Sequence, residues 1–331
     1  MSTATKEIND IPVTWRLDEI DIEASLTQPK GNGPFPAVIM VAGSGPTDRN
    51  WNSPLIPGTN GSAALLAQVL TELGYVTLRY DKRASGPHGR ENAMKLTGRI
   101  SMQSHTDELA GGVKYLAAQN FVDSQKIFAL ANSEGCIHAL NYQTQENNPT
   151  FAGLILTAPP ARPVGLVAHE QLAAQLNPIP GGDKWLASYD SAIADFIAGR
   201  AVNVDESLPE GLRNMLLATT NPVNQPFACE LWITDPATLL KKVNVPVLVV
   251  IGKKDIQVNW QADGSVIEAI SRTKKNITIA YPENANHVLK HEPRERSQLT
   301  AAEVTSSYNA DNSILDKESV TIITTWLASQ R

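Results

Sequence analysis

The hydrophobic pattern near the amino end of the chain differs from the pattern that follows it. Apolar and polar side chains alternate over residues 13–17 and 20–26, which predicts two half-exposed antiparallel strands. From residue 37 onward the apolar runs are short and continuous, as is typical of strands covered on both faces. These runs predict strands at residues 37–42, 75–80, 126–131, 152–157 and 245–251, and a further strand is predicted at residues 277–281.

Segments with helical spacing of their apolar residues separate several of these strands. They cover residues 63–73, 106–118 and 137–144, and an amphipathic helix at residues 319–327 closes the chain. Strands that alternate with helices of this length need crossover connections, which place the strands parallel to one another. We therefore predict an α/β fold with a mostly parallel central sheet flanked by helices.

The alternation stops after residue 157 and resumes only near residue 244. The stretch between them contains no strand-like run and is helical in pattern. We interpret it as a helical cap inserted after the sixth strand; the alternative is that these helices simply cover the sheet. The predicted division is a core made of residues 1–160 and 241–331, with a cap of residues 161–240.

Composition and charge narrow the class of protein. Of the 331 residues, 42% are hydrophobic and 19% are charged, which excludes global disorder. The net charge of −6 lacks the basic excess of a nucleic-acid-binding protein. The longest apolar run is too short to span a bilayer, and residues 1–7 contain no apolar signal sequence. We expect a cytoplasmic protein without nucleic-acid or membrane partners.

The metal-binding residue types are few and scattered. Two cysteines, Cys136 and Cys229, exclude a disulfide scaffold and a cysteine-rich metal cluster. The six histidines show no spacing of a metal-binding motif. The sequence therefore predicts neither a metal site nor a cofactor.

The strand at residues 126–131 leads through a sharp turn centred on Ser133 into a helix. Such a turn, a nucleophile elbow, exposes the serine hydroxyl in a strained conformation. The motif requires small residues two positions before and after the serine, and Ala131 and Gly135 meet this need, although the first is commonly glycine. The alternative is an ordinary serine that caps the helix.

A serine hydroxyl becomes a good nucleophile only when a base takes its proton and an acid orients that base. In this class of fold the acid and then the histidine follow the serine along the chain. Asp255 follows the strand at residues 245–251, and His287 follows the strand at residues 277–281. Because the carboxyl ends of parallel strands share one edge of the sheet, we predict a catalytic triad of Ser133, Asp255 and His287.

Acyl transfer also needs hydrogen-bond donors for the developing oxyanion. The backbone N–H of Glu134 would supply one. The second would come from the glycine-rich loop after the strand at residues 37–42, from Ser44 or from its neighbour Gly43. A plain tight turn is the alternative interpretation of this loop.

Other candidate residues are less well placed. His291 lies in a polar surface context, His138 is expected to pack on a helix face, and Cys136 is expected to be a small buried side chain within a helix. Asp235 and Asp263 lie away from strand ends, and Asp235 is expected to cap a helix that begins with Pro236. The remaining histidines, expected at the surface or on helix faces, are His88, His105 and His169.

Five separated motifs resemble those of the α/β-hydrolase superfamily and, within it, of the EstD-like serine esterases. They lie at residues 42–50, 80–86, 132–135, 252–258 and 284–290. The resemblance implies the same triad, and it implies that Asp48–Arg49 and Asp81–Lys82–Arg83 support the oxyanion loop. Ala131 and Ala84 depart from the family pattern, since each replaces a glycine.

The expected function is hydrolysis of small to medium uncharged carboxylic esters through an acyl-enzyme on Ser133. Trp185, Tyr189 and Phe196 share one face of a cap helix and are expected to shape the substrate pocket. A thioesterase, an amidase or peptidase, and a carbon–carbon bond hydrolase could all use this triad. A non-catalytic ligand-binding protein is the alternative from another class. The sequence makes no prediction of the oligomeric state.

Overall fold

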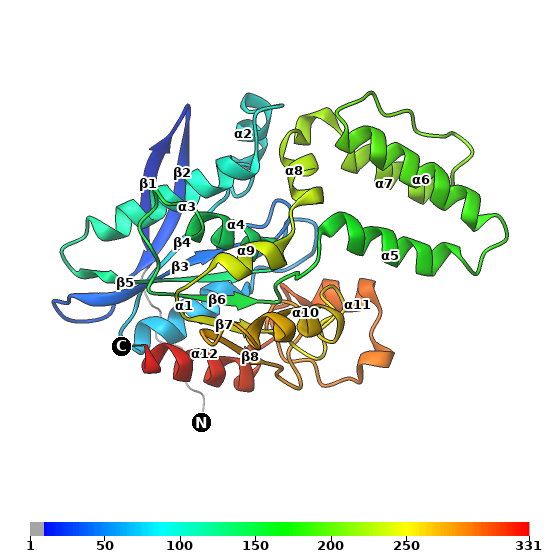
Figure 1. Cartoon of the computed structure of the whole chain (residues 1–331). Coiled ribbons are helices and arrows are strands. Elements are labelled where there is room, and N and C mark those ends of the chain that lie inside the picture. The colour runs from blue at the N-terminus through cyan, green and yellow to red at the C-terminus, as the bar shows by residue number, and fades with distance from the viewer. Residues whose placement is uncertain (1–9, 331) are drawn as a thin grey trace.

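The computed structural model describes residues 10–330. A central sheet has helices on both faces, and a group of helices stands beyond one end of it (Figure 1). Residues 1–7, in which the sequence predicts no signal peptide, lie outside the described residues. No helix in the described part of the chain is long and apolar enough to cross a membrane.

The sheet has the strand order β1-β2-β4-β3-β5-β6-β7-β8. β2 is antiparallel to β1 and to β4, and all the other neighbours are parallel. The predicted strands and the mostly parallel sheet are thus confirmed. The strands are β1 (Ile11–Leu17), β2 (Ile20–Thr27), β3 (Phe35–Val41), β4 (Val76–Tyr80), β5 (Val122–Asn132), β6 (Gly153–Thr157), β7 (Val247–Val250) and β8 (Ile277–Ala280).

Alternate residues of the central strands point into two hydrophobic cores, one on each face of the sheet. In β3, Val38 and Met40 join the core beneath α1 (Ser62–Glu72) and α12 (Lys317–Ser329). Ile39 and Val41 join the opposite core, beneath α3 (Met102–Ala117), α4 (Glu134–Gln143), α9 (Pro236–Lys242) and α10 (Ala262–Ser271). Burial on both faces explains why these strands are continuously apolar in sequence.

Between β6 and β7 the chain forms the cap and then α9. The cap helices have a hydrophobic core of their own, and in Figure 1 α5, α6 and α7 stand away from the sheet. Asp235 caps α9 by accepting from the Ala237 N–H at 3.0 Å, as expected from the sequence. Ala237 and Leu240 of α9 belong to the core of the sheet rather than to that of the cap. The cap helices are α5 (Val164–Leu176), α6 (Gly182–Ile197), α7 (Glu210–Thr219), η1 (Pro222–Asn224) and α8 (Phe227–Ile233).

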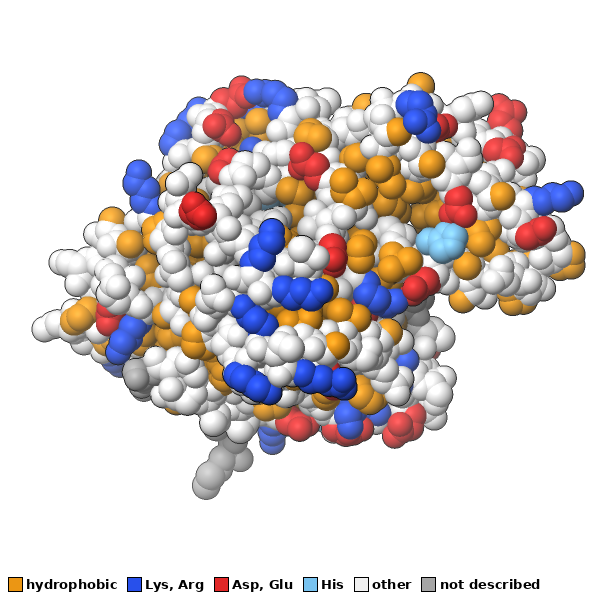
Figure 2. Space-filling view, viewed as in Figure 1, with side chains coloured by type: hydrophobic (Ala, Val, Ile, Leu, Met, Phe, Trp, Pro, Cys, Tyr) orange, Lys and Arg blue, Asp and Glu red, His pale blue; other side chains and the backbone are white. Residues whose placement is uncertain are grey.

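Three further short elements were not expected from the sequence: α2 (Gly89–Lys95), η2 (Arg296–Gln298) and α11 (Ala301–Ser307). Exposed large apolar side chains are concentrated on the cap, where Figure 2 shows hydrophobic side chains over α8 and its neighbours. Those on the cap helices are Leu166, Ile197, Met215, Leu217, Val223 and Ile233.

Candidate active site

Ser133 occupies a strained turn between β5 and α4. Its φ is 54° and its ψ is −124°, a region that residues other than glycine rarely adopt. The Ser133 N–H donates to the Thr157 carbonyl at the end of β6, at 2.9 Å, which ties the turn to the sheet. The hydroxyl makes no capping hydrogen bond to α4. The helix-capping alternative is therefore wrong for this serine, whereas Ser101 does cap α3, by accepting from the Ser104 N–H at 3.1 Å.

The elbow needs small residues at positions 131 and 135 because the strand and the helix pack closely around it. A Cβ atom added to Gly135 would lie 2.6 Å from the carbonyl oxygens of Val41 and Ala42, so α4 could not approach β3 with a larger residue there. The alanine at position 131 is fully buried in the core of the sheet. Its methyl group is accommodated, so this departure from glycine leaves the elbow intact.

Asp255 and His287 meet beside the elbow. The His287 Nδ1 and the Asp255 Oδ2 are 2.9 Å apart, and both residues are buried. The other carboxylate oxygen of Asp255 accepts from the N–H groups of Gln257, at 2.8 Å, and Val258, at 3.0 Å. These bonds fix the carboxylate so that it faces the imidazole. The loops after β7 and β8 must lie close together for these side chains to meet. Gly252 permits this approach, because a Cβ on it would lie 2.0 Å from the Ala285 carbonyl oxygen.

Two residues that sequence reasoning missed hold His287 in place. The Asn132 Nδ2 donates to the His287 carbonyl at 3.0 Å. The Tyr308 ring stacks on the imidazole with centroids 6.2 Å apart, and its hydroxyl accepts from the Gln257 Nε2 at 3.0 Å. Asn132 lies within the elbow motif, immediately before Ser133, and could have been found there. Tyr308 follows α11 in a segment without a recognisable motif.

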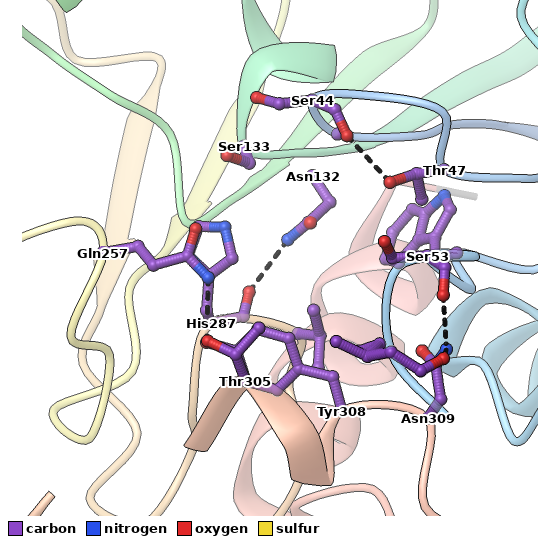
Figure 3. A pocket seen from close by; sticks show the side chains of 14 residues that line it. Ser44, Thr47, Ser53, Asn132, Ser133, Gln257, His287, Thr305, Tyr308 and Asn309 are labelled. Carbon is purple, nitrogen blue, oxygen red and sulfur yellow. Dashed lines mark hydrogen bonds between the residues drawn. The ribbon is translucent and has the colours of Figure 1, made fainter. Parts of the chain in front are cut away.

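Two cavities meet at these residues. Both are lined by Ser44, Ser133, Gln257 and His287. The smaller has a volume of about 180 Å³ and is lined largely by polar side chains, and Figure 3 shows Ser133 and His287 at one side of it. The larger, of about 390 Å³, extends beneath α5 and α8 of the cap. Its cap residues are Val164, Val167, Ala168, Gln171 and Leu231.

The three cap residues expected to form the pocket line neither cavity. Tyr189 is buried in the hydrophobic core of the cap, and Trp185 packs against that core. Phe196 is also buried, at the carboxyl end of the same helix. The apolar face of α6 holds the cap helices together, and α5 and α8 face the site instead. This corrects the pocket assignment: helical periodicity identifies an apolar face but not its partner.

The loop after β3 lies against the nucleophile. A Cβ on Gly43 would lie 3.2 Å from the Ser133 Cβ. The Ser44 carbonyl accepts from the Thr47 Oγ1 at 2.8 Å, as the dashed line in Figure 3 shows. Neither the Ser44 N–H nor the Glu134 N–H donates to another group among residues 10–330. Both are therefore available as donors at the cavity that Ser44 and Glu134 share.

Charged residues brace this loop from behind. The Arg49 guanidinium bonds the Asp81 carboxylate through Nε at 2.9 Å and Nη2 at 2.6 Å, and the Arg49 N–H donates to the same carboxylate at 2.6 Å. Burial raises the pKa of Asp81, although Arg49 opposes this effect. Asp48 accepts from the N–H groups of Asn50, at 2.8 Å, and Asn52, at 2.9 Å. These contacts provide the support that the family resemblance implies.

A buried charged network lies beneath the elbow. His138 Nε2 lies 3.2 Å from Glu134 Oε1, and Arg83 Nε donates to Glu108 Oε1 at 2.5 Å. His105 lies 3.0 Å from the other Glu108 oxygen and 4.6 Å, between ring centroids, from His138. Burial lowers the pKa of His138 to about 4. Burial alone would raise the pKa of Glu108, but His105 and Arg83 outweigh it and lower it to about 2.

The remaining candidates have other surroundings. His88 and His291 are exposed and His169 is half-buried, whereas His105 is buried on its helix face. Cys136 is fully buried within α4, where burial raises the pKa of its thiol. The described residues include no group of three or more histidine, cysteine or acidic side chains that could hold a metal ion.

Asp263, which the sequence placed away from the strand ends, lines the larger cavity. Its carboxylate accepts from the Ala161 N–H at 3.1 Å and from the Arg162 guanidinium at 3.2 Å. Asp263 therefore joins α10 to the segment that enters the cap.

Known proteins resemble this chain in sequence and in fold. The model of the prolyl oligopeptidase family matches residues 62–188. The chain is 28% identical over 275 residues to esterase EstD of Thermotoga maritima; the match covers 81% of this chain and spans 58% of the length of that relative. Solved structures with related folds include Est1E of Butyrivibrio proteoclasticus, with a TM-score of 0.53, 15% identity, and coverage of 96% of this chain and 99% of that one.

Two further structures have similar scores. An esterase of Pyrococcus furiosus has a TM-score of 0.53 and 17% identity, and the match covers 97% of this chain and 91% of that one. The acylaminoacyl peptidase of Pyrococcus horikoshii has a TM-score of 0.52 and 16% identity, over 86% of this chain and 38% of that one. At these identities the likeness concerns the fold.

Proposed function

We propose that this chain, which has the α/β-hydrolase fold, is a serine hydrolase that cleaves carboxylic esters. One observation carries the proposal. Ser133, held at a positive φ, shares a cavity with His287, whose Nδ1 is bonded to the buried Asp255. Strain of this kind is stored where function requires it, and the nucleophile–base–acid order is that of an acyl-transfer triad. The sequence identity to an esterase supports the same reaction.

In the proposed mechanism, His287 Nε2 takes the proton of Ser133 Oγ as the oxygen attacks the ester carbonyl. Asp255 holds the Nδ1–H tautomer of the imidazole and stabilises its cation. The N–H groups of Ser44 and Glu134 bind the oxyanion of the tetrahedral intermediate. The alcohol leaves with the proton from His287. A water molecule then gives a proton to His287 as it attacks the acyl-enzyme. His287 returns that proton to Ser133 Oγ as the bond to the acyl group breaks, and the acid is released.

The cavity linings favour uncharged esters of small to medium size. The larger cavity is lined by two acidic residues, Glu134 and Asp263, and the set that lines it includes no lysine or arginine. Each of these carboxylates is already paired, Glu134 with Lys82 and Asp263 with Arg162. A charged substrate group would therefore lose its hydration there without gaining either of them as a partner. Apolar residues of α5 and α8 would contact an aliphatic or aromatic group beneath the cap.

Active-site labelling tests this proposal. The protein and its Ser133→Ala variant are treated with a fluorophosphonate and assayed with p-nitrophenyl esters of increasing chain length. We expect labelling and turnover in the unaltered protein and neither in the variant. Ser101→Ala is the matched control, because its hydroxyl caps a helix, and we expect it to be labelled normally. An unaltered protein that neither labels nor hydrolyses any ester would contradict the proposal; labelling of Ser133→Ala would contradict the nucleophile.

Amide or peptide hydrolysis is a second candidate, favoured by the match of residues 62–188 to the prolyl oligopeptidase family. Pairs of p-nitrophenyl esters and p-nitroanilides with the same acyl group separate the two activities. Comparable kcat/KM values for a pair would favour the peptidase, and hydrolysis of the ester alone would favour the esterase.

A further inference from the structure

One buried lysine contacts both segments that would supply oxyanion donors. Lys82 follows β4 and is only 5% exposed. Its Nζ donates to the Gly43 carbonyl at 2.5 Å and lies 3.3 Å from Glu134 Oε1. The Lys82 carbonyl accepts from the N–H and the hydroxyl of Ser85, at 2.8 and 2.9 Å, so the lysine itself is held.

The contact with Gly43 acts on the first donor through a single peptide group. The carbonyl oxygen of Gly43 and the N–H of Ser44 belong to the same planar unit, and in a trans peptide they point in opposite directions. An ammonium group that anchors the oxygen on one side therefore aims the N–H toward the other. This peptide lies next to the nucleophile, as the 3.2 Å between a Cβ on Gly43 and the Ser133 Cβ shows.

The contact with Glu134 acts on the second donor. The Glu134 side chain is held by Lys82 and, at 3.2 Å, by His138 Nε2, while its backbone N–H begins α4 beside Ser133. Burial alone would raise the pKa of Glu134, but the Lys82 ammonium and His138 outweigh it and lower the pKa well below its usual range. The carboxylate thus remains charged and attracted to Lys82.

We propose that Lys82 is a positioning residue that fixes the orientation of both oxyanion donors through the Gly43 carbonyl and the Glu134 carboxylate. The proposal rests on the serine hydrolase function proposed above. Hydrogen bonds to charged groups are the stronger ones, and a preset donor does not have to reorient when charge develops on the substrate. A buried ion pair that only contributed to folding would not need to contact the oxyanion loop.

The test compares Lys82→Met with Lys82→Arg. Loss of one oxyanion donor lowers kcat by about a hundredfold or more. We therefore expect Lys82→Met to lower kcat for p-nitrophenyl acetate at least that far with little change in KM. It should also weaken inhibition by a trifluoromethyl ketone, whose adduct with Ser133 places an oxyanion in the same hole. Lys82→Arg retains a charged donor and is expected to restore part of kcat.

Lys290→Met is the matched control. The Lys290 ammonium is also buried and donates to a backbone carbonyl, that of Asn60 at 2.8 Å, but it does not contact the oxyanion loop. We expect this variant to lose thermal stability. Its affinity for the trifluoromethyl ketone, relative to its KM for the ester, should equal that of the unaltered protein. A crystal structure of Lys82→Met is expected to show the 43–44 peptide rotated.

Three results would overturn the proposal. The first is a Lys82→Met variant that folds and keeps its kcat and inhibitor affinity while Ser133→Ala is inactive; the proposed function would then stand without the lysine. The second is an unchanged 43–44 peptide in the crystal structure of Lys82→Met. The third is the absence of labelling and hydrolysis in the unaltered protein, which would overturn the proposed function as well.

Discussion

At the scale of single residues, Gly135 allows α4 to approach β3 closely behind the nucleophile. Gly135→Ala would place a methyl group 2.6 Å from two backbone oxygens, and overpacking of this kind costs about 1–3 kcal/mol of unfolding free energy. We expect a lower melting temperature and a large loss of kcat, because α4 carries the Glu134 N–H. Thermal unfolding and ester turnover measure the two effects.

Gly211→Ala is the control for this substitution. Gly211 lies near the start of α7, and a Cβ there would meet no atom within 4 Å. Alanine in a helix is more stable than glycine by about 0.5–1 kcal/mol, so this variant should melt slightly higher. Equal stability of Gly135→Ala and the unaltered protein would contradict the steric account.

His138 makes stability depend on pH. Burial, followed by the charge of His105, lowers its pKa from 6.5 to about 4 in the folded protein. The unfolded chain therefore binds the proton more readily between these values, and stability must fall as the pH falls through this window. Groups that face the ring are Glu134, His105 and Lys82, of which Glu134 favours the protonated imidazole and the other two oppose it.

His138→Gln tests this dependence. Each pH unit within the window changes the free energy of unfolding by about 1.4 kcal/mol for one titrating group. Through this residue, the unaltered protein should therefore lose on the order of 2 kcal/mol of unfolding free energy between about pH 6.5 and pH 5. The variant should lose correspondingly less over the same interval in urea titrations. Identical slopes for the two proteins would show that His138 does not titrate in this way.

At the scale of elements, α5 rather than α6 is the cap helix that lines the cavity at Ser133 and His287. Val167 of α5 lines the larger cavity, whereas Tyr189 of α6 is buried in the cap core. Val167→Phe should narrow the cavity and lower kcat/KM for p-nitrophenyl octanoate about tenfold or more relative to the acetate, since one misplaced methylene alone costs about 1–3 kcal/mol.

The matched control for this series is Tyr189→Phe. The Tyr189 hydroxyl is buried and has no hydrogen-bond partner within the described part of the chain, so its removal should leave both the fold and the chain-length preference unchanged. If Tyr189→Phe altered the preference and Val167→Phe did not, the original expectation from the sequence would be right and the assignment to α5 wrong.

At the scale of the whole molecule, the sheet and the cap differ in the size of their hydrophobic cores. The cores on the two faces of the sheet draw on all eight strands, whereas the cap core consists of a few residues from its own helices and connections. Regions with few buried apolar contacts open at a lower free energy. Amide hydrogen exchange should therefore be faster in α6 and α7 than in β3 and β5, and equal protection would contradict this expectation.

Much of this architecture could be predicted because local sequence patterns report burial directly. β3 to β7 are covered on both faces, so their residues are continuously apolar, and the residues at their carboxyl ends could be assigned to one edge of the sheet. This pattern predicts that Ser133, Asp255 and His287 lie at the same edge of the sheet. The elbow was recognisable because its steric demand falls on neighbours in sequence, Ala131 and Gly135.

What the sequence by itself determined is the α/β fold, the inserted cap and the set of chemical groups at the strand ends. The tertiary structure alone decided which cap helix faces the site, that Tyr308 stacks on His287, and that Lys82 reaches both Gly43 and Glu134. The physical reason is the range of the interactions. Periodicity and turn geometry arise between neighbours along the chain, whereas these contacts join segments far apart in sequence, which only the packing of the whole molecule brings together.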